Sequence, residues 1–600
     1  MIKVSDYILG FLADRGVKHI FMITGGASMH VNESIGCEKR IQYVCNHHEQ
    51  ACAMAAEGYA RLTGELGVIS VTTGPGAVNT LNGVYGAYTD SVPMLILAGQ
   101  VRRDTCARVR GMTNIRQLGD QEADMLGMVQ GITKYAVLVS DPSTIRYHLE
   151  KAYHLATTGR PGPCWLDLPV DVQAVKLDPA ALRGYDPSED DPKIDQEEMS
   201  RQCGQVIEKL ESAKRPVILA GTGVRAAHAT EEFEEVIRKL GIPVTTAWTH
   251  DLIASDDELF CGRPGSIGER PGNFTVQNSD VLLVLGSRLN IRQVSYNWTA
   301  FAREAFKIQV DVDPAELEKP FVRPDLPIIC DLKVFLGELS AQLNGWKAVP
   351  AHQEWLAWCR ERVARYPVVQ PKQRQSRSPL NPYYFIELLF DGLDPDDAVV
   401  CANASACIIP YQVARLKKGQ RLISNSGSAS LGYDLPAAVG AAVGHEGKRV
   451  VCLAGDGSIH FNIQELQTIR HHNLPVKIVV LNNGGYLSMR QTQSNFFGHL
   501  VGAGPGSGVS FPDYTKLAQA YGIRADCVTG LDTMPRLWDS LAAPGPSLCE
   551  VMLDGNQEIE PRLKPRQLPD GTIVSPALED MYPFLEPEEL RSNLFIRPLQ

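Results

Sequence analysis

Residues 450–486 read VVCLAGDGSIHFNIQELQTIRHHNLPVKIVVLNNGGY, and they decide the fold of the region around them. The apolar runs at 450–453 and 476–481 are typical of buried strands, and residues 462–471 between them repeat apolar side chains at a helical spacing. A strand, a helix and a second strand form a βαβ unit, whose right-handed crossover sets the two strands side by side in a parallel sheet. The Gly-Asp-Gly turn at 455–457 and the residues after the second strand therefore meet at the carboxyl edge of that sheet.

Asp456 and Asn483 are expected to lie close together at this edge, although they are far apart in the chain. Both side chains offer oxygen atoms, and the carbonyl groups of Gly484 and Gly485 can approach closely because glycine has no Cβ. Mg²⁺ binds one or two protein oxygens of this kind and completes its octahedron with water and phosphate oxygens. The sequence therefore predicts a magnesium-bridged diphosphate site; the alternative is an ordinary tight turn in a doubly wound domain.

The Gly-Asp-Gly turn, the spacer and the Asn-Asn pair resemble the signature of thiamine diphosphate (ThDP) enzymes, and their flanks resemble the acetolactate synthase large-subunit branch. The resemblance implies that Asp456, Asn483 and the carbonyl group of Gly485 ligate Mg²⁺. It also implies the fold class, which is α/β with three doubly wound parallel-sheet domains, namely a pyrimidine-binding, a central and a diphosphate-binding domain.

Residues 45–64, CNHHEQACAMAAEGYARLTG, predict an alanine-rich helix that begins at Glu49 after a short strand. An acidic residue in a first helical turn is usually a surface charge that favours the helix dipole. Together with TTGPGAVNTLNGV at 72–84, however, the segment resembles the pyrimidine-binding domain of ThDP enzymes. In that family the matching glutamate bonds to the aminopyrimidine ring, so that the cofactor's own amine can act as the base. We therefore expect Glu49 to be catalytic.

Two further residues are expected near the reacting centre by the same resemblance. Gln100 closes the strand after the Gly-Pro-Gly turn, and Lys134 matches a lysine near the active-site entrance of the family. The chain between them also carries Arg108, Arg110 and Arg116. These arginines are either part of a solvated loop or contacts of an anionic substrate, since guanidinium groups suit carboxylate and phosphate.

The Gly/Ser-rich loop in 424–442 runs into a predicted helix, where backbone N–H groups and hydroxyls can meet diphosphate oxygens. By alignment with the family, Leu431 is the apolar side chain that wedges between the two cofactor rings. The other cofactor-binding residues that the resemblance implies in this domain are Ser405, Gly427, Gly455, Gly457, Ser458 and Tyr486.

The chain departs from acetolactate synthase in three places. An expected Gln-His pair is Ala404-Ser405, the Glu-Glu-Gln-Gly-Met stretch after Asn-Asn is Gly-Gly-Tyr-Leu-Ser at 484–488, and the tryptophan that favours a larger acceptor aligns with Thr492. These positions lie where the second substrate sits. They leave the cofactor chemistry intact and favour a reshaped, roomier acceptor pocket.

In the middle of the chain, PVILAGTGVRAA at 216–227 predicts a strand and a glycine turn, which packing explains about as well as a ligand does. Residues 276–292 and 307–317 resemble the domain that binds FAD in acetolactate synthase, with Arg288 and Asp311 at matching places. FAD is therefore an expected cofactor, although some relatives keep this fold without one.

The chain has 600 residues, which is too many for one core, so three or four domains are expected. Its prolines oppose a long helix near the C-terminus, and relatives fold such tails over the active site, so we interpret the tail as a lid. The predicted parts are a pyrimidine-binding domain at 1–185, a central domain at 190–345, a linker at 346–382, a diphosphate-binding domain at 383–560 and an active-site tail at 561–600.

Bulk properties exclude several classes of protein. A formal charge of −11 without a basic cluster argues against nucleic-acid binding. The chain has no run of about 18 apolar residues that could span a membrane, and its first residues lack the apolar core of a signal peptide. The 14 cysteines form no CxxC pair, which favours reduced thiols over disulfides or a zinc site. We expect a cytoplasmic protein.

The resemblance implies a ThDP- and Mg²⁺-dependent enzyme that decarboxylates a 2-oxo acid, pyruvate, and joins the activated acetaldehyde to a second carbonyl. The changed acceptor positions and the basic segment 102–116 favour a ketone acceptor, and the alternative is an acetolactate synthase that uses two pyruvates. A homodimer or homotetramer with active sites at the dimer interface also follows from the resemblance. A non-catalytic regulatory or structural paralogue remains open. An NAD-dependent dehydrogenase is disfavoured, because no GxGxxG opens a βαβ unit.

Overall fold

The structure is a computed structural model that describes the chain except for residues 113, 192–194, 248–250, 568–569, 598 and 600. Contacts within the chain divide it into two compact units. The first unit contains Met1–Pro192, Asp396–Ala406 and Ile423–Leu553, and the second contains Lys193–Pro395, Cys407–Leu422 and Asp554–Gln600.

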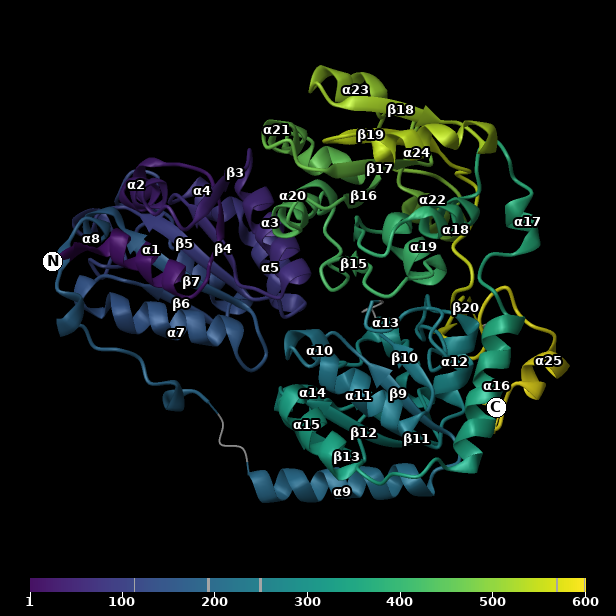
Figure 1. The fold of residues 1–600 in the computed structure, drawn as a ribbon. Helices are drawn as coiled ribbons and strands as arrows, with labels where there is room; N and C mark the ends of the chain where they lie inside the picture. Colours follow the sequence, from purple (N-terminus) through teal and green to yellow (C-terminus); the bar gives the residue numbers. More distant parts are fainter. Residues whose placement is uncertain (113, 192–194, 248–250, 568–569, 598, 600) are drawn as a thin grey trace. The chain divides into compact units, whose positions relative to one another are not determined.

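The N-terminal part of the first unit is a parallel sheet with helices on both faces (Figure 1). Alternate strand residues point to different cores: Phe21 and Ile69 pack with α3 (Glu49–Thr63), whereas Ile20 and Val68 pack with α1 (Val4–Asp14). The strands, in spatial order, are β3 (Gln42–Cys45), β2 (His19–Met22), β4 (Gly67–Val71), β5 (Met94–Gln100), β7 (Pro163–Pro169) and β6 (Tyr135–Leu138). The other helices are α2 (Met29–Cys37), α4 (Pro75–Asn79), α5 (Leu81–Thr89), α6 (Met125–Val129), α7 (Ile145–Thr157) and α8 (Val170–Gln173).

The C-terminal part of the first unit carries a second six-stranded sheet, and it confirms the βαβ unit predicted at 450–486. The paired strands β16 and β17 are parallel, but the helix between them is shorter than predicted, because a 3₁₀ turn at Ser458–Asn462 precedes α21 (Glu465–His471). The strands, in spatial order, are β15 (Arg421–Ile423), β14 (Ala398–Cys401), β16 (Val450–Gly455), β17 (Val476–Asn482), β19 (Ser547–Met552) and β18 (Arg524–Val528). Further helices are α19 (Ser405–Val413), α20 (Asp434–Gly444), α22 (Leu487–Phe496), α23 (Tyr514–Ala520) and α24 (Pro535–Ala542).

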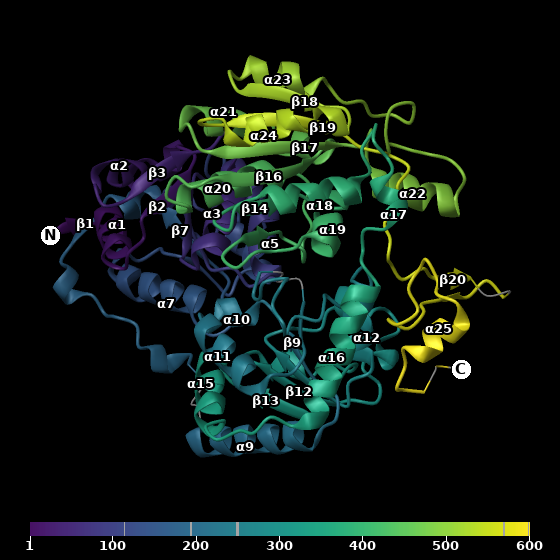
Figure 2. The ribbon, with the colours of Figure 1, turned by 45° about the vertical axis from the view of Figure 1, so that its right-hand side comes forward.

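The helices α3 and α20 pack side by side and join the two sheets of the first unit, as Figures 1 and 2 both show. Their contact is made by glycine and alanine. A Cβ on Gly58 would lie 2.3 Å from the carbonyl oxygen of Ala437, and one on Gly440 would lie 1.8 Å from that of Ala55. The two backbones therefore approach so closely that no side chain fits between them, and small residues fix how the two halves meet.

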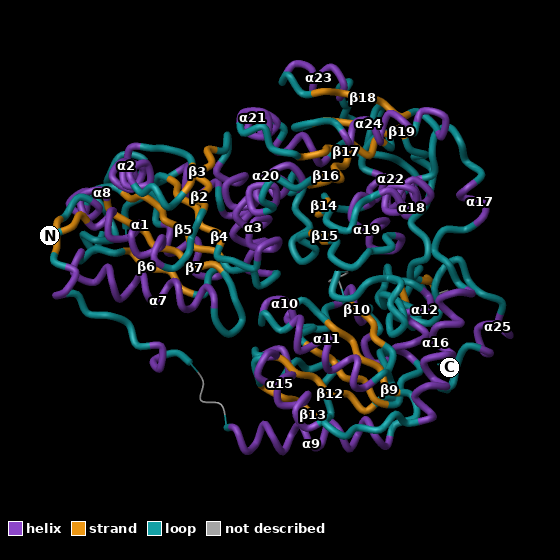
Figure 3. Tube along the Cα trace, viewed as in Figure 1, coloured by secondary structure: helices purple, strands orange, loops and turns teal. Residues whose placement is uncertain are grey.

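The second unit contains the third parallel sheet, and its helices lie on both sides of the strands (Figure 3). The strands, in spatial order, are β10 (Val244–Thr246), β9 (Pro216–Ala220), β11 (Val281–Leu285), β12 (Phe306–Asp311) and β13 (Leu326–Ile329). The helices around this sheet are α9 (Gln196–Ser212), α10 (Gly223–Ala226), α11 (Thr230–Leu240), α12 (Arg270–Gln277), α13 (Ile291–Val294), α14 (Pro314–Leu317), α15 (Leu332–Gln342) and α16 (Pro350–Arg365), and the second unit also contains α17 (Pro371–Arg374) and α18 (Pro382–Gly392). Three parallel α/β sheets confirm the predicted fold class; the predicted domain bounds stay predictions.

The described part of the tail contains two short strands and one short helix. The strands β20 (Arg566–Gln567) and β21 (Ile573–Val574) pair in antiparallel fashion, and α25 spans Pro587–Ser592. The lid role predicted for this tail stays a prediction. None of the helices in the described ranges combines the length and the apolar composition that crossing a membrane requires.

Candidate active site

The structure brings Asp456 and Asn483 together at the carboxyl edge of the β16–β17 pair, as the βαβ unit predicts. The Asp456 carboxylate accepts three backbone hydrogen bonds, from Gly457 at 2.7 Å, Asn483 at 3.1 Å and Gly485 at 2.8 Å. Asp456 is 3% exposed, and burial raises the pKa of its carboxyl group to about 6. A nearby cation would favour the charged form of such a buried acid.

The Asn483 side chain has an unused oxygen beside this carboxylate. Its amide nitrogen donates to Ser405 Oγ at 3.4 Å, but its Oδ1 is buried and has no hydrogen-bond partner among the described residues. Buried polar atoms are almost always satisfied, so an orphaned oxygen here is available to a bound group. One carboxylate, one amide oxygen and the Gly485 carbonyl are oxygen donors of the kind that Mg²⁺ takes, so these residues fit the ion.

The backbone around Asp456 can adopt this shape only with glycine at two positions. A Cβ on Gly485, whose φ is +128°, would lie 2.6 Å from the Ala503 carbonyl oxygen, and one on Gly457 would lie 2.2 Å from the Tyr486 ring. Arg490 then holds the loop, donating to the carbonyl oxygens of Asn483 at 2.8 Å and of Gly484 at 2.7 Å. The predicted residues Gly457, Gly485 and Tyr486 thus form one packed turn.

The loop that carries Leu431 is fastened to the same turn. Ser458 Oγ accepts a hydrogen bond from the Gly432 N–H at 2.9 Å and donates to Asp434 Oδ2 at 2.6 Å. Asn462 donates to the Gly432 carbonyl oxygen at 2.8 Å. Leu431, the predicted wedge between the cofactor rings, is therefore fixed relative to Asp456 through its neighbour in the chain.

We predict that Ser458→Ala destabilises this turn. The substitution leaves the buried Asp434 carboxylate and the Gly432 N–H without their shared partner, which costs about 1–3 kcal/mol. The thermal midpoint of the variant should fall below that of the wild type, measured side by side in one buffer. Ser510→Ala, at an exposed position, is the matched control and should leave the midpoint unchanged. Equal midpoints for the two variants would contradict the assignment.

Two alanines near this turn have left-handed backbone conformations. Ala404 has φ of +49° and Ala429 has φ of +53°, and Asn403 joins their loops by donating to the Ala429 carbonyl oxygen at 3.1 Å. Non-glycine residues in this region are strained and gather at functional sites. The strain lies beside the predicted residues Ser405, which begins α19, and Gly427, whose N–H donates to Asp90 at 3.3 Å.

Glu49 begins α3, as predicted, at the carboxyl edge of the N-terminal sheet. His48 caps the helix, because its side chain accepts a hydrogen bond from the Gln50 N–H at 3.0 Å. The half-buried Glu49 carboxylate accepts from Asn79 at 3.0 Å, and a Cβ on Gly76 would come within 3.3 Å of it. The Gly-Pro-Gly turn therefore leaves room around the Glu49 carboxylate, whose catalytic role stays a prediction.

Gln100 lies at the same edge, but its side chain is fully used inside the fold. Its oxygen accepts from Thr73 Oγ1 at 2.8 Å and from the Val101 N–H at 2.9 Å. Its nitrogen donates to the Ala123 carbonyl oxygen and to Asp167, both at 3.0 Å. Every hydrogen-bonding position of this 2% exposed residue is occupied, so the geometry supports a structural role and gives no support to a catalytic one.

Lys134 is not brought to Glu49. It precedes β6 at the amino edge of the sheet, where its N–H donates to the Pro163 carbonyl oxygen at 2.8 Å. Its amine donates to the carbonyl oxygens of Leu155 and Thr158, which end α7. Within this chain Lys134 therefore lies at the opposite edge of the sheet from Glu49, and its expected position near the active-site entrance stays a prediction.

Of the arginines in the 102–116 segment, Arg102, Arg103 and Arg108 form ion pairs, with Asp104, Asp171 and Asp124. Arg108 forms an ion pair with Asp124 at 2.7 Å, and Arg110 and Arg116 are exposed. Because Asp124 already balances the charge of Arg108, this arrangement favours a solvated loop over a contact between Arg108 and an anionic substrate.

In the second unit, Arg288 and Asp311 lie at the carboxyl ends of neighbouring parallel strands. Asp311 is the last residue of β12, and Arg288 lies in the turn after β11. A Cβ on Gly221, after β9, would lie 2.3 Å from the Gly286 carbonyl oxygen, so the two glycine turns pack directly on each other. Thr246 Oγ1, at the end of β10, is buried and lacks a partner among the described residues. Ligands of parallel sheets bind at this edge, and an orphaned hydroxyl there fits a bound group.

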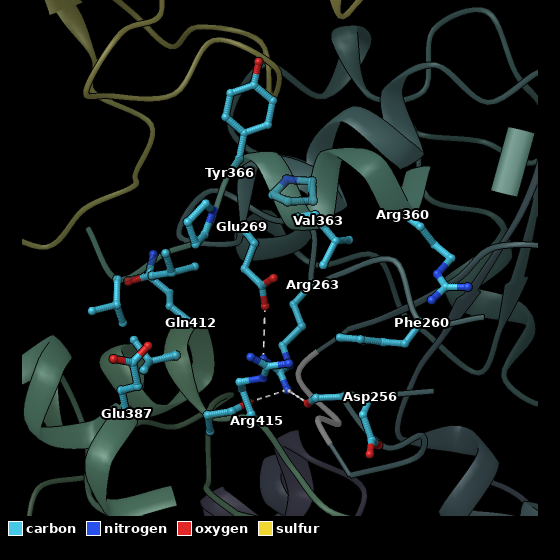
Figure 4. Close-up of a pocket in the computed structure, with 18 of the residues that line it drawn as sticks. Asp256, Phe260, Arg263, Glu269, Arg360, Val363, Tyr366, Glu387, Gln412 and Arg415 are labelled. Carbon is cyan, nitrogen blue, oxygen red and sulfur yellow. Dashed lines mark hydrogen bonds and ion pairs between the residues drawn. The ribbon is translucent and has the colours of Figure 1, made fainter. Parts of the chain in front are cut away.

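A cavity of about 470 Å³ in the second unit contains none of the predicted site residues (Figure 4). Figure 4 shows the Arg263 guanidinium directed at Glu269, and the two groups lie 3.0 Å apart. Arg374 pairs with Glu387 at 2.6 Å. Four arginines and four acidic residues line the cavity, so its charges balance and select no class of ligand: Arg263, Arg360, Arg374, Arg415, Asp256, Asp257, Glu269 and Glu387.

Three domain models of one enzyme family match this chain, one in the region of each of the three sheets. Models of thiamine pyrophosphate enzymes match the chain at residues 2–124 (N-terminal TPP binding domain), 203–339 (central domain) and 405–551 (C-terminal TPP binding domain). The chain belongs to the thiamine pyrophosphate-dependent enzyme family. Thiamine pyrophosphate is ThDP under its other name, so the family inferred from residues 450–486 is confirmed.

Within this family the chain is acetolactate synthase-like. The acetolactate synthase large subunit of Lactococcus lactis subsp. lactis is 32% identical over 568 residues, covering 93% of this chain and 94% of the relative. That of Porphyra purpurea is 32% identical and covers 93% of each chain. A probable acetolactate synthase large subunit of Methanocaldococcus jannaschii is 32% identical over 92% of each chain. The similarity extends over nearly the whole length of these relatives.

Sequence reasoning missed two residues of this site, Glu465 and Arg490. Glu465 falls on the inward face of α21 with Leu466 and Ile469, and an acid on an apolar helix face is the signal that could have found it. Arg490 lies on α22, after the Asn-Asn pair, and no sequence pattern around it indicates a role in the site.

Proposed function

We propose that this chain is an acetolactate synthase, which decarboxylates pyruvate and joins the resulting two-carbon unit to a second pyruvate. Relatives that carry this name match it along nearly their whole length. The observation that carries the proposal is the Asp456 carboxylate beside the orphaned Asn483 oxygen, because this pair fits a magnesium ion that would anchor a diphosphate.

Bound ThDP would supply the electron sink that lets CO₂ leave a 2-oxo acid. The chain itself would bind and orient. Asp456, Asn483 and Gly485 would hold Mg²⁺, Leu431 would keep the two cofactor rings apart, and Glu49 would hold a proton at the pyrimidine nitrogen. The loops of 427–432 and 403–405 would enclose the site and exclude water.

A second candidate uses a ketone as acceptor in place of the second pyruvate. The observation that favours it is the composition of the acceptor region, with Ala404-Ser405, Tyr486 and Thr492 at positions where acetolactate synthase has other side chains. Tyr486 packs against Gly457 and meets Phe511 edge to face at 6.0 Å, so it reshapes the wall next to the metal turn.

Incubation with ¹³C-labelled pyruvate, ThDP and Mg²⁺ separates the two candidates by mass spectrometry. Acetolactate with label from two pyruvates supports the main proposal. Labelled CO₂ and a new product only after a ketone is added would replace it with the second candidate. Bound ThDP without any CO₂ release would indicate a non-catalytic paralogue.

We also propose that the central domain binds FAD, because Arg288, Asp311 and the glycine turns stand at the ligand-binding edge of its sheet. Purified protein is expected to carry flavin absorption, and heat denaturation should release about one FAD per chain, measured by chromatography. Protein that is colourless and remains so after incubation with FAD would contradict this proposal.

We also propose a homodimer or homotetramer with active sites at the dimer interface, as the resemblance to acetolactate synthase implies. Tyr43, Tyr85, Phe496 and Phe497 are 44–67% exposed in the single chain, and burying such side chains against a second copy would be favourable. Light scattering of active protein should give two or four times the chain mass of 65.8 kDa. Active protein of a single chain mass would contradict it.

A further inference from the structure

Glu465 is a buried acid that holds the turn in front of Glu49. It lies in α21 and is 0% exposed, and no cation pairs with it in the part of the chain that the structure describes. Its Oε1 accepts a hydrogen bond from the His47 N–H at 2.9 Å. Its Oε2 accepts from Asn46 Nδ2 at 2.9 Å and from Thr468 Oγ1 at 2.7 Å.

Two of these three donors belong to the connection between β3 and α3. Asn46 and His47 follow β3, and α3 begins at Glu49 directly after them. The Asn46 N–H also donates to the Met22 carbonyl oxygen at 3.2 Å. The Met22 carbonyl group of the sheet and the Glu465 side chain therefore both hold this connection. Together they restrict where α3 can begin.

The hydrogen bonds of Glu465 argue against a residue that only fills space in the core. A buried carboxylate without a cation is costly, and the site recovers that cost only through charge-assisted hydrogen bonds, which are shorter and stronger than neutral ones. An amide in its place could not accept from the His47 N–H and from both other donors together. The hydrogen bonds that Asn46 and His47 donate to Glu465 thus set the position of the 46–47 backbone.

Glu465 also belongs to the βαβ unit that presents Asp456 and Asn483. It follows the metal turn through the 3₁₀ segment, whose Ser458 and Asn462 are fastened to the Leu431 loop. The contact with Asn46 and His47 consequently links the predicted metal turn of the chain to the predicted catalytic glutamate of the same chain.

We propose that Glu465 is a positioning residue for Glu49: by holding Asn46 and His47 it fixes where the Glu49 carboxylate stands. The inference rests on the proposed function only for the role of Glu49 on bound ThDP. It assigns Glu465 no contact with substrate or cofactor.

The test measures two quantities on holoenzyme, the ThDP dissociation constant by calorimetry with Mg²⁺ and the rate at which the C2 proton of bound ThDP exchanges with deuterium. Glu465→Gln should keep the dissociation constant within about threefold. It should slow the exchange about 10- to 100-fold, because a misplacement of about 1 Å can cost that much. Glu208→Gln, at an exposed position on α9, is the control and should change neither quantity.

Asn46→Ala approaches the same contact from its other side and provides a second variant if Glu465→Gln does not fold. It should slow exchange in the same way, and the double variant should be no slower than the worse single one, since both remove one interaction. Exchange at the wild-type rate in either folded variant would overturn the proposal, as would weakened ThDP binding with normal exchange in the bound fraction. Normal exchange in Glu49→Gln would instead refute the role of Glu49 itself.

Discussion

Glu49→Gln is expected to lower the rate of CO₂ release from pyruvate by about 10²- to 10⁴-fold while ThDP still binds, because that is the usual contribution of a positioned acid or base. The amide keeps the size of the side chain and its contact with Asn79, which donates to Glu49 Oε2 at 3.0 Å, but it cannot carry the charge that favours the reactive form of the pyrimidine. Steady-state CO₂ release and calorimetric ThDP binding, on the same preparation, measure the two effects.

Glu65→Gln is the matched control for this variant, because Glu65 is exposed just beyond the end of α3. It should retain full activity. Turnover of Glu49→Gln near the wild-type rate would remove Glu49 from the mechanism, and lost ThDP binding would make it a binding residue.

Asp456→Asn is expected to weaken Mg²⁺-dependent ThDP binding by at least about 100-fold, an effect at the upper end of what even supporting residues of metal sites contribute. The substitution removes the carboxylate from the predicted metal site. It also places an NH₂ group where the carboxylate now accepts from Gly457, Asn483 and Gly485, so at least one backbone N–H loses its partner. Calorimetric titration of ThDP at saturating Mg²⁺ measures the change.

Asp539→Asn, at an exposed position on α24, controls for the loss of one negative charge and should bind ThDP as the wild type does. An unchanged ThDP dissociation constant in Asp456→Asn would show that the predicted metal turn holds no metal.

The metal turn could be predicted from the sequence because its geometry is local. Two apolar strand runs and one helical spacing determine a βαβ unit, and handedness then decides that Asp456 meets Asn483. Glu49 at the start of α3 was predictable for a similar reason, since a helix boundary leaves a clear pattern of alanines. In both cases a short stretch contains the interactions that set its own shape.

Residues whose position depends on distant partners were less predictable. Lys134 has the expected neighbours in sequence, but the carbonyl groups at the end of α7 hold its amine at the amino edge of the sheet. Gln100 stands where expected, yet Thr73, Val101, Ala123 and Asp167 use its amide completely. Glu465 went unnoticed because its partners, Asn46 and His47, come from the other half of the chain. Such contacts are set by tertiary packing, which no local pattern encodes.

Titration of the purified chain with ThDP, with and without Mg²⁺, tests most directly whether the Asp456 turn and Glu49 belong to one ThDP site. Saturable binding of about one ThDP per chain, which disappears when Mg²⁺ is chelated, is the result that the structure predicts. No heat of binding with Mg²⁺ present, or the same heat after chelation, would contradict it.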